Sequence, residues 1–220
     1  MIWDELETGL EQLTTAGLLR RRRVLDTPCG PEALIEGRRL TAFCSNDYLG
    51  LANHPALITA VQEAAARWGV GSGASHVVSG HLRPHAELEE RLAAFTGFEQ
   101  ALYFSTGYMA NLAIVPALLE RNDAVFADKL NHASLIDAAQ LARAEHIRYP
   151  HGDLEHLAAR LARSSARRKL ILTDAVFSMD GDLAPLPELF ELAERFDAWL
   201  VIDDAHGFGV LGPGGRGSLA

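Results

Sequence analysis

The 220-residue sequence is poor in cysteine and in clustered positive charge, and each shortage excludes a class of protein. Its two cysteines, Cys29 and Cys44, match neither the spacing of a metal site nor a disulfide framework. The formal net charge is −9, and the only basic cluster is the run RRRR at residues 20–23. The chain therefore does not have the lysine- and arginine-rich surface that binding to a nucleic acid requires.

Long apolar runs are missing as well, because no stretch approaches the roughly 20 residues that span a bilayer. The N-terminal segment MIWDELETGLEQL is acidic and amphipathic, unlike a signal peptide, which has a basic start followed by an apolar run. Hydrophobic residues make up 48% and charged residues 22% of the chain, as in ordinary soluble globular proteins. We expect a soluble, cytoplasmic protein with enough chain for one sizeable domain.

From residue 55 onward, helical patterns alternate with short apolar runs, and no hairpin signals separate the runs. The runs are apolar on both faces, which is typical of a parallel sheet that helices cover on each side. The sequence therefore predicts an α/β fold. The strands are expected at residues 101–105, 124–128, 146–149, 169–177 and 199–203, and the helices at 57–68, 84–96, 111–120, 134–144, 154–164 and 186–196.

Polar clusters follow four of these predicted strands: STGY from residue 105, DKLNH from 128, SMDGD from 178 and DDAH from 203. Ligands of parallel α/β sheets bind beyond the carboxyl ends of the strands, so the clusters indicate one site. Each cluster taken singly has a structural interpretation. STGY is either a phosphate seat at a helix start or an ordinary N-cap, His132 caps a helix or stacks on an aromatic ligand, and Ser178 lies in a turn.

Asp203 and His206 are harder to explain as structure alone, because they end an apolar strand. A carboxylate there pays a large desolvation cost unless it meets a cation, either a metal ion or a protonated pyridine nitrogen. No further histidine pair or carboxylate cluster lies at ligand spacing nearby, so no metal site is expected. The glycine-rich GVGSGAS at residues 69–75 follows a helix rather than a strand, which excludes a dinucleotide-binding loop.

Five ordered segments together resemble one family, the α-oxoamine synthases. They are FCSNDYLGLANHP from residue 43, STGYMAN from 105, LNHASLIDA from 130, VFSMDGD from 176 and DDAHGFGVLGPGGRG from 203. The resemblance implies pyridoxal 5′-phosphate (PLP) as cofactor and the large domain of the aspartate-aminotransferase fold (fold type I), incomplete at its C-terminus. Residues 1–45 would be an N-terminal arm or part of a smaller lobe, and residues 46–220 the PLP-binding domain.

The resemblance also implies roles for single residues. Asp203 would pair with the pyridine nitrogen of PLP and keep it protonated. The other cofactor contacts would be His206 and Ser178 at the phenolic oxygen, His132 on the ring face, and Gly107 with Tyr108 at the phosphate. Asp203, His206 and His132 would thus be catalytic.

Substrate contacts would come from His132 and from Arg20, whose cation suits an acyl carboxylate. The alternative for the arginine run is a solvated helix face.

The implied reaction is a decarboxylative condensation of L-alanine with a pimeloyl thioester, carried by coenzyme A or by a carrier protein. Within the family, the LLRRRR and DDAHGFGVLG segments most resemble the branch that begins the assembly of the biotin rings. The resemblance further implies a homodimer. Two alternatives stay open: a glycine-using relative of the same family, and a non-catalytic binding or scaffold protein.

PLP chemistry of this kind needs a lysine that carries the cofactor as a Schiff base. The sequence contains only Lys129 and Lys169, and the family does not place its Schiff-base lysine at either position. In relatives that lysine lies just downstream of the position of Ala220. We therefore expect the chain to be the front portion of an enzyme and to be inactive alone.

Overall fold

The structure is a computed structural model that describes residues 2–220. It divides into two compact units, Met1–Arg67 and Trp68–Ala220, which we describe separately. The predicted boundary between residues 45 and 46 stays a prediction. Within residues 2–220, every helix is too short or too polar to span a lipid bilayer.

The first unit consists of local elements. Helix α1 (Ile2–Thr15) precedes a two-stranded antiparallel hairpin, β1 (Glu32–Ile35) with β2 (Arg38–Thr41), and helix α2 (Pro55–Trp68) follows. The hairpin turn is Glu36-Gly37, and both residues have positive φ, 51° and 75°, as a two-residue type I′ turn requires. No strand was predicted before residue 101, so this hairpin was not expected from the sequence.

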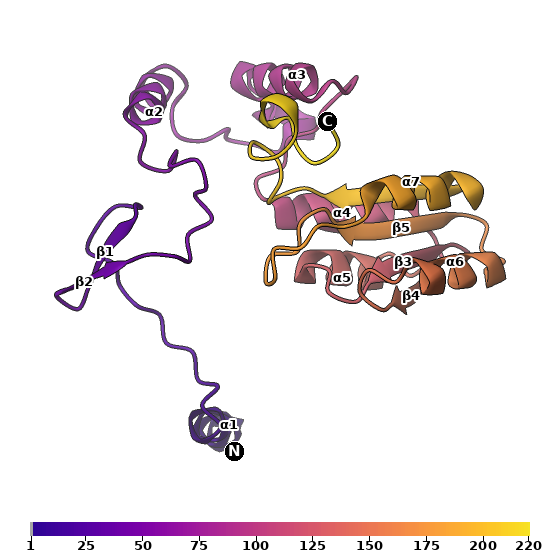
Figure 1. The fold of residues 1–220 in the computed structure, drawn as a ribbon. Coiled ribbons are helices and arrows are strands. Elements are labelled where there is room, and N and C mark those ends of the chain that lie inside the picture. Colours follow the sequence, from indigo (N-terminus) through magenta and orange to yellow (C-terminus); the bar gives the residue numbers. More distant parts are fainter. Residues whose placement is uncertain (1) are drawn as a thin grey trace. The chain divides into compact units, whose positions relative to one another are not determined.

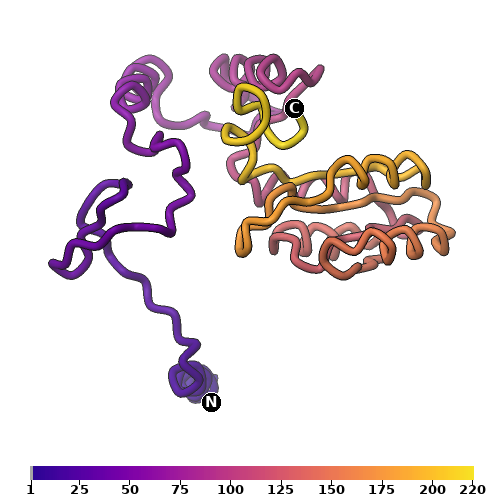
Figure 2. The backbone as a smooth tube through the Cα atoms, in the orientation of Figure 1, coloured from indigo at the N-terminus to yellow at the C-terminus, as the bar shows by residue number. Residues whose placement is uncertain are grey.

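The second unit is built on a four-stranded sheet in the order β4-β3-β5-β6. All neighbouring strands pair in parallel, as predicted. A helix carries the chain back between successive strands, which Figure 2 shows as a continuous tube. The strands are β3 (Ala124–Asp128), β4 (Glu145–Tyr149), β5 (Lys169–Asp174) and β6 (Ala198–Asp203), and the helices are α3 (Arg83–Thr96), α4 (Gly107–Leu118), α5 (Ala133–Leu141), α6 (Leu154–Arg163) and α7 (Leu186–Arg195).

Helices cover both faces of the sheet and form two separate cores (Figure 1). Successive side chains of a strand point to opposite faces, so Phe126 and Ala127 belong to different cores. On one face, α6 and α7 contribute Leu157, Leu161, Leu189 and Ala193 against Ala124, Phe126 and Ile171. On the other face, α4 and α5 contribute Val115, Leu119, Leu135 and Ala138 against Val125, Ala127, Leu170 and Leu172.

The predicted strand at residues 101–105 is wrong, because these residues form no strand. Their apolar composition suits a strand, but a strand also needs a neighbour for its backbone, and none of the described strands pairs with them. The Tyr103 N–H instead donates to the Glu89 carboxylate at 2.8 Å. The strand predicted at 169–177 ends earlier, at Asp174, beyond which Val176 makes only an isolated bridge to Leu183.

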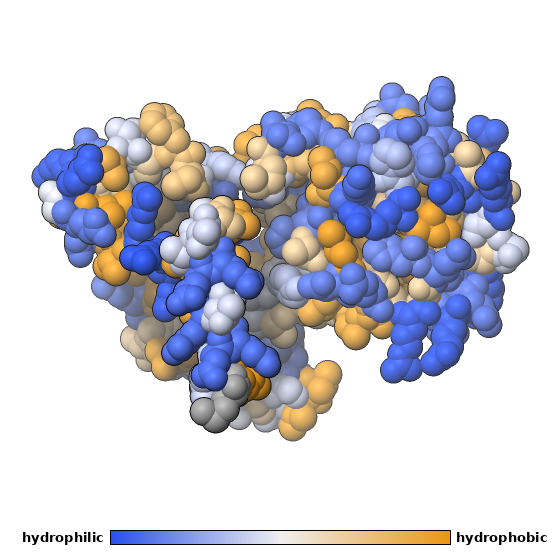
Figure 3. Space-filling view, turned by 90° about the horizontal axis from the view of Figure 1, so that it is seen from below, coloured by the Kyte–Doolittle hydropathy of each residue, from blue (hydrophilic) through white to orange (hydrophobic). Residues whose placement is uncertain are grey.

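Apolar side chains are exposed in both units, and orange groups interrupt the blue surface in Figure 3. In the sheet unit, β6 is half-buried although β3 is fully buried. The difference follows from position, because β6 lies at the edge of the sheet and β3 has a neighbour on each side.

Candidate functional site

Three neighbouring strands of the sheet end in aspartate: β3 in Asp128, β5 in Asp174 and β6 in Asp203. Asp174 and Asp203 are register partners, so their side chains start from adjacent positions. Because the strands are parallel, all three carboxyl groups gather at one edge of the sheet. Ligands of parallel α/β sheets bind at this edge. The polar clusters recognised in the sequence follow the ends of these same strands.

A hydrogen-bond network holds Asp203 from the neighbouring helix. The side-chain amide of Asn111 donates to Asp203 Oδ2 at 2.7 Å and to Ser134 Oγ at 2.9 Å. Ser134 Oγ in turn lies 2.7 Å from His132 Nδ1. The other Asp203 oxygen, Oδ1, accepts from the Ala205 N–H at 3.0 Å. Asp203 and His132 are therefore linked through two buried polar side chains, Asn111 and Ser134.

Asp174 lies beside this network. Burial raises the pKa of its carboxyl group to about 6, and the nearby charge of Asp203 also raises it. Opposing contributions come from the His132 N–H, which donates to Asp174 Oδ2 at 2.8 Å, and from the charges of His132 and His206. The structure thus brings Asp203, His132 and His206 around one buried acid that the sequence analysis did not select.

Tyr108 and Gly107 open helix α4 next to His132. Thr106 is the N-cap residue, and its Oγ1 accepts from the Met109 N–H at 3.1 Å. The ring of Tyr108 meets that of His132 edge to face at 6.4 Å between centroids. Its hydroxyl donates to the Asp137 carboxylate, and this hydrogen bond raises the pKa of Tyr108. The first turn of α4 carries the backbone N–H groups and positive dipole end that suit an anion.

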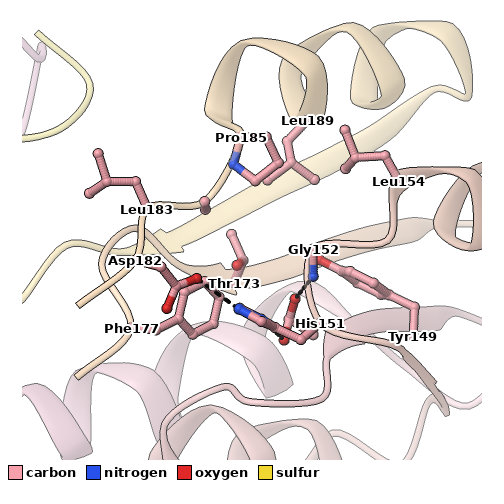
Figure 4. Close-up of a pocket in the computed structure, with 12 residues that line it drawn as sticks. Tyr149, His151, Gly152, Leu154, Thr173, Phe177, Asp182, Leu183, Pro185 and Leu189 are labelled. Atoms are coloured by element: carbon pink, nitrogen blue, oxygen red, sulfur yellow. Dashed lines mark hydrogen bonds and ion pairs between the residues drawn. The ribbon is translucent and has the colours of Figure 1, made fainter. Parts of the chain in front are cut away.

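Ser178 is exposed in the loop that follows β5. The other end of this loop is held by the contact of Asp182 with His151 (Figure 4). Asp182 Oδ2 lies 2.8 Å from His151 Nε2, and His151 Nδ1 lies 3.0 Å from Asp128 Oδ1. Burial disfavours the charged imidazole, but the interactions with Asp128 and Asp182 outweigh burial and raise the pKa of His151. The three side chains line a pocket with Tyr149, Thr173 and Phe177.

The two lysines lie at opposite ends of the strands: Lys129 directly follows Asp128 at this edge, and Lys169 lies at the far end of β5. Lys169 begins β5, at the opposite end of the strand from Asp174, and its Nζ donates to the Phe196 carbonyl at 3.1 Å. Lys129 follows β3 and is exposed. Arg20 is exposed in the first unit, between α1 and β1, and its substrate role stays a prediction.

The donor set at the edge suits a flat cationic ring that carries an anionic group. Asp203 offers a half-buried carboxylate, and its register partner Asp174 adds a second acid. Negative charge in this position needs a cation, because desolvation otherwise disfavours it. His132 offers a ring, and the first turn of α4 offers N–H donors for a phosphate. Asn111 and Asp174 were missed in the sequence, although each polar residue interrupts an apolar run.

The chain is similar along its length to known proteins. The family model for aminotransferase class I and II matches residues 38–218. The 8-amino-7-oxononanoate synthase of Herminiimonas arsenicoxydans is 69% identical over 219 residues, which are 100% of this chain and 56% of that protein. The chain thus spans just over half the length of this curated relative.

Solved structures show the same likeness. The serine palmitoyltransferase of S. paucimobilis, solved with PLP and myriocin bound, superposes with a TM-score of 0.90 at 35% identity, covering 98% of this chain and 55% of that one. The 8-amino-7-oxononanoate synthase of Francisella tularensis gives a TM-score of 0.68 at 34% identity, covering 80% and 48%.

Proposed function

The chain belongs to the aminotransferase class I and II family, and on that premise we propose that the whole protein makes 8-amino-7-oxononanoate in biotin biosynthesis. The reaction joins L-alanine to a pimeloyl thioester with PLP as cofactor, and it releases carbon dioxide and the free thiol carrier. Sequence identity of 69% to a curated enzyme of that name supports the substrate pair. The predicted fold class is confirmed by the family match and by the TM-score of 0.90.

The single observation that carries the proposal is Asp203, held at the end of β6 by the Asn111 amide at 2.7 Å. PLP, when bound, supplies an electron-withdrawing ring that eases removal of a proton from the α-carbon of an amino acid. Asp203 would hold the proton of the pyridine nitrogen, because a carboxylate favours the charged form of a nearby cation. Asn111 would keep the carboxylate pointed at the ring.

Five further residues would complete the cofactor site, four of which come from α4, from the start of α5 and from the loop after β5. His132 would lie against the ring face, and its backbone N–H is fixed by Asp174 at 2.8 Å. Gly107 and Tyr108, in the first turn of α4, would direct N–H groups to the phosphate. Ser178 would reach the phenolic oxygen from the loop after β5.

His206 would lie near the same phenolic oxygen, and it is close enough to Asp174 for a positive charge on its ring to lower the pKa of that carboxyl group. Asp174 is a positioning residue in this proposal, because it acts on PLP through His132. Because the pKa of Asp174 is about 6, its carboxyl group is mostly ionised near neutral pH and loses most of its negative charge under mildly acidic conditions.

The proposal extends to partners and location. Arg20 would bind the carboxylate of the pimeloyl chain, since a guanidinium pairs with a carboxylate through two hydrogen bonds. The enzyme would act as a cytoplasmic homodimer on small-molecule substrates. The two cysteines, which are free and exposed, are in keeping with a reducing compartment.

A glycine-using α-oxoamine synthase is the second candidate, because the same cofactor site would serve it. The two differ in the pocket for the alanine methyl group, so substrate preference separates them. A non-catalytic scaffold is the third candidate. The scaffold hypothesis predicts that the whole protein folds but forms no product with either amino acid.

The direct test is product formation by the whole protein as its own cell produces it, with L-alanine or glycine and pimeloyl-CoA. We expect 8-amino-7-oxononanoate, detected by mass, and at least ~100-fold less from Asp203→Asn, because a neutral amide no longer favours the protonated ring. Asp197→Asn is the matched control, since Asp197 is exposed at the opposite end of the same strand. The 220-residue chain alone should give no product, because neither of its two lysines stands at the Schiff-base position of the family. Equal rates in both variants would overturn the role of Asp203.

A further inference from the structure

Three histidines gather outside the proposed cofactor site, at the turn that leads into helix α3. One ligand atom from each of His76, His81 and His85 lies within 4.8 Å of the others. The centroids of the three rings are 4.7, 5.1 and 5.7 Å apart. Among the described residues, this is the one group of three or more histidine, cysteine or acidic side chains with such spacing.

A single turn of π-helix, η1 (His76–Gly80), brings the first two histidines together. The Gly80 N–H donates to the Ser75 carbonyl at 2.9 Å and closes the turn. A Cβ at Gly80 would lie 1.8 Å from the Ala74 carbonyl oxygen, so no other residue fits this turn. Isolated π turns are found frequently at functional sites. The backbone therefore fixes His76 beside His81 by its own geometry.

The ring nitrogens of the cluster face one another. His76 Nδ1 lies 2.9 Å from His81 Nδ1, and two neutral imidazoles satisfy that contact only if one nitrogen carries the proton. The opposite nitrogen of His81, Nε2, lies 3.6 Å from Glu89 Oε2. A carboxylate behind a histidine is the arrangement that orients metal-binding imidazoles and raises their basicity. Glu89 is itself held by the Tyr103 N–H at 2.8 Å.

His85 completes the cluster from the first turn of α3. Its ring stacks on Tyr103 at 6.0 Å between centroids, with 20° between the ring planes. Its Nδ1 accepts from the Leu82 N–H at 3.0 Å. A metal ion on this ring breaks that hydrogen bond in either binding mode. If the ion binds Nδ1, it uses the lone pair that accepts the hydrogen bond. If the ion binds Nε2, the proton of Nε2 moves to Nδ1, which can then no longer accept. The helix start and the metal site are coupled through this exchange.

From these contacts we propose that His76, His81 and His85 form a binding site for a divalent transition-metal ion, for which Zn²⁺ is the best match. Imidazole nitrogen suits Zn²⁺ rather than Mg²⁺ or Ca²⁺, which prefer oxygen. Zinc–nitrogen distances of about 2.0–2.1 Å place tetrahedral ligand atoms ~3.4 Å apart. Small ring rotations reach that spacing, since His76 and His81 are exposed. The fourth position is open to water.

The inference does not rest on the proposed synthase activity, because none of the three histidines belongs to the proposed cofactor site. It also departs from the expectation of no metal, which considered only the two cysteines and the surroundings of Asp203 and His206. The spacing His-x4-His-x3-His from residue 76 to residue 85 was visible in the sequence. It was not a recognisable metal signature there, because the π turn that closes the gap between His76 and His81 has no sequence pattern of its own.

The test uses the whole protein as its own cell produces it, without an affinity tag, freed of metal by dialysis against a chelator and titrated with Zn²⁺ in a calorimeter. We expect one Zn²⁺ per chain and no binding of Mg²⁺. Affinity should fall in acid, because protons compete with the metal ion for the imidazole nitrogens. His76→Ala and His81→Ala should each weaken binding at least ~100-fold, and Glu89→Gln by ~10-fold, as outer-shell partners do.

His156→Ala is the matched control, because His156 lies outside the cluster on α6. Circular dichroism verifies that each variant keeps its helices, which exposed positions such as His76 and His81 permit. A Co²⁺ titration gives a second measurement, since tetrahedral Co²⁺ absorbs strongly in the visible range and octahedral Co²⁺ does not. The proposal is overturned if Zn²⁺ does not bind, or if it binds equally well to His81→Ala and to His156→Ala.

Discussion

The two units of the molecule differ in what holds their elements in place. Before residue 68, Ala33 is the only buried apolar side chain among the described residues. Helix α1 leaves Ile2, Leu6 and Leu10 exposed, and no residue of α1 or α2 is buried. In the sheet unit, the strands bury both faces under helices, and Phe126 and Leu170 are fully inaccessible. Short-range interactions within helices and turns determine the structure of the first unit, and packing between residues distant in the sequence determines that of the second.

This contrast explains where the candidate site is built. A binding site needs side chains held in fixed positions, and rigid elements supply them better than local turns. Asp174, Asp203 and His132 all stand at ends of elements whose other residues are packed in the two cores. The apolar face of α1 has no comparable support within its own unit.

The largest expected effect compares the two units directly. Phe126→Ala should lower the free energy of unfolding by about 3–5 kcal/mol, because it removes a large side chain from a closed core. Leu10→Ala, at a position that is 54% exposed, should change it by less than ~0.5 kcal/mol. Urea denaturation followed by circular dichroism measures both. Similar losses for the two variants would break the contrast.

The next effect concerns the buried network of the site. Asn111→Ala removes the donor to Asp203 and Ser134 and should cost about 1–3 kcal/mol, because buried acceptors are left unpaired. Asn46→Ala in the first unit, where the partner Tyr48 is exposed, should be close to neutral. The same denaturation experiment separates them. A neutral Asn111→Ala would show that water replaces the amide at no cost.

A local effect is expected in the hairpin of the first unit. Gly37→Ala should weaken the β1–β2 turn by about 1 kcal/mol, because an alanine at φ 75° is strained. Amide hydrogen exchange should rise for the hairpin and stay unchanged in β3 and β5. Faster exchange in the sheet as well would mean that the two units unfold together. Gly30→Ala is the control, since Gly30 does not have positive φ.

The smallest effect is the pH dependence of the His151 anchor. The folded-state pKa of His151 is raised, so its stabilising contribution is complete below the unfolded value of ~6.5. That contribution is lost as pH rises through the higher folded pKa. The loss should be at most about 1 kcal/mol, as for other partly exposed pairs. His151→Gln should flatten the dependence of the unfolding free energy between pH 6 and 9, and an unchanged slope would contradict this.

Much of the sheet unit could be predicted from the sequence. The bounds of β3 are those predicted, and His132 lies at a helix start as expected. Periodicity sufficed here because each strand is buried by helices close to it along the chain. The strand predicted at residues 101–105 failed for the opposite reason, since apolar composition does not reveal whether a neighbouring strand exists.

The site was only partly predictable. Asp203 and His206 stood out as polar residues at the end of an apolar strand. Asp174 and Asn111 were missed, because their importance comes from register and from a contact between residues 92 positions apart. The histidine cluster was missed because it depends on a π turn, and the hairpin because Glu36-Gly37 is not among the commonest type I′ pairs.

The most direct test of the account is the PLP content of the protein purified from its own cell, measured by absorbance after alkaline release. The account predicts one PLP per chain for the natural protein and for the control Asp197→Asn. It also predicts a large loss of PLP from Asp203→Ala, whose ring contact is gone. A natural protein without PLP, or an Asp203→Ala variant that retains all of it, would contradict the claim that the end of β6 binds the cofactor.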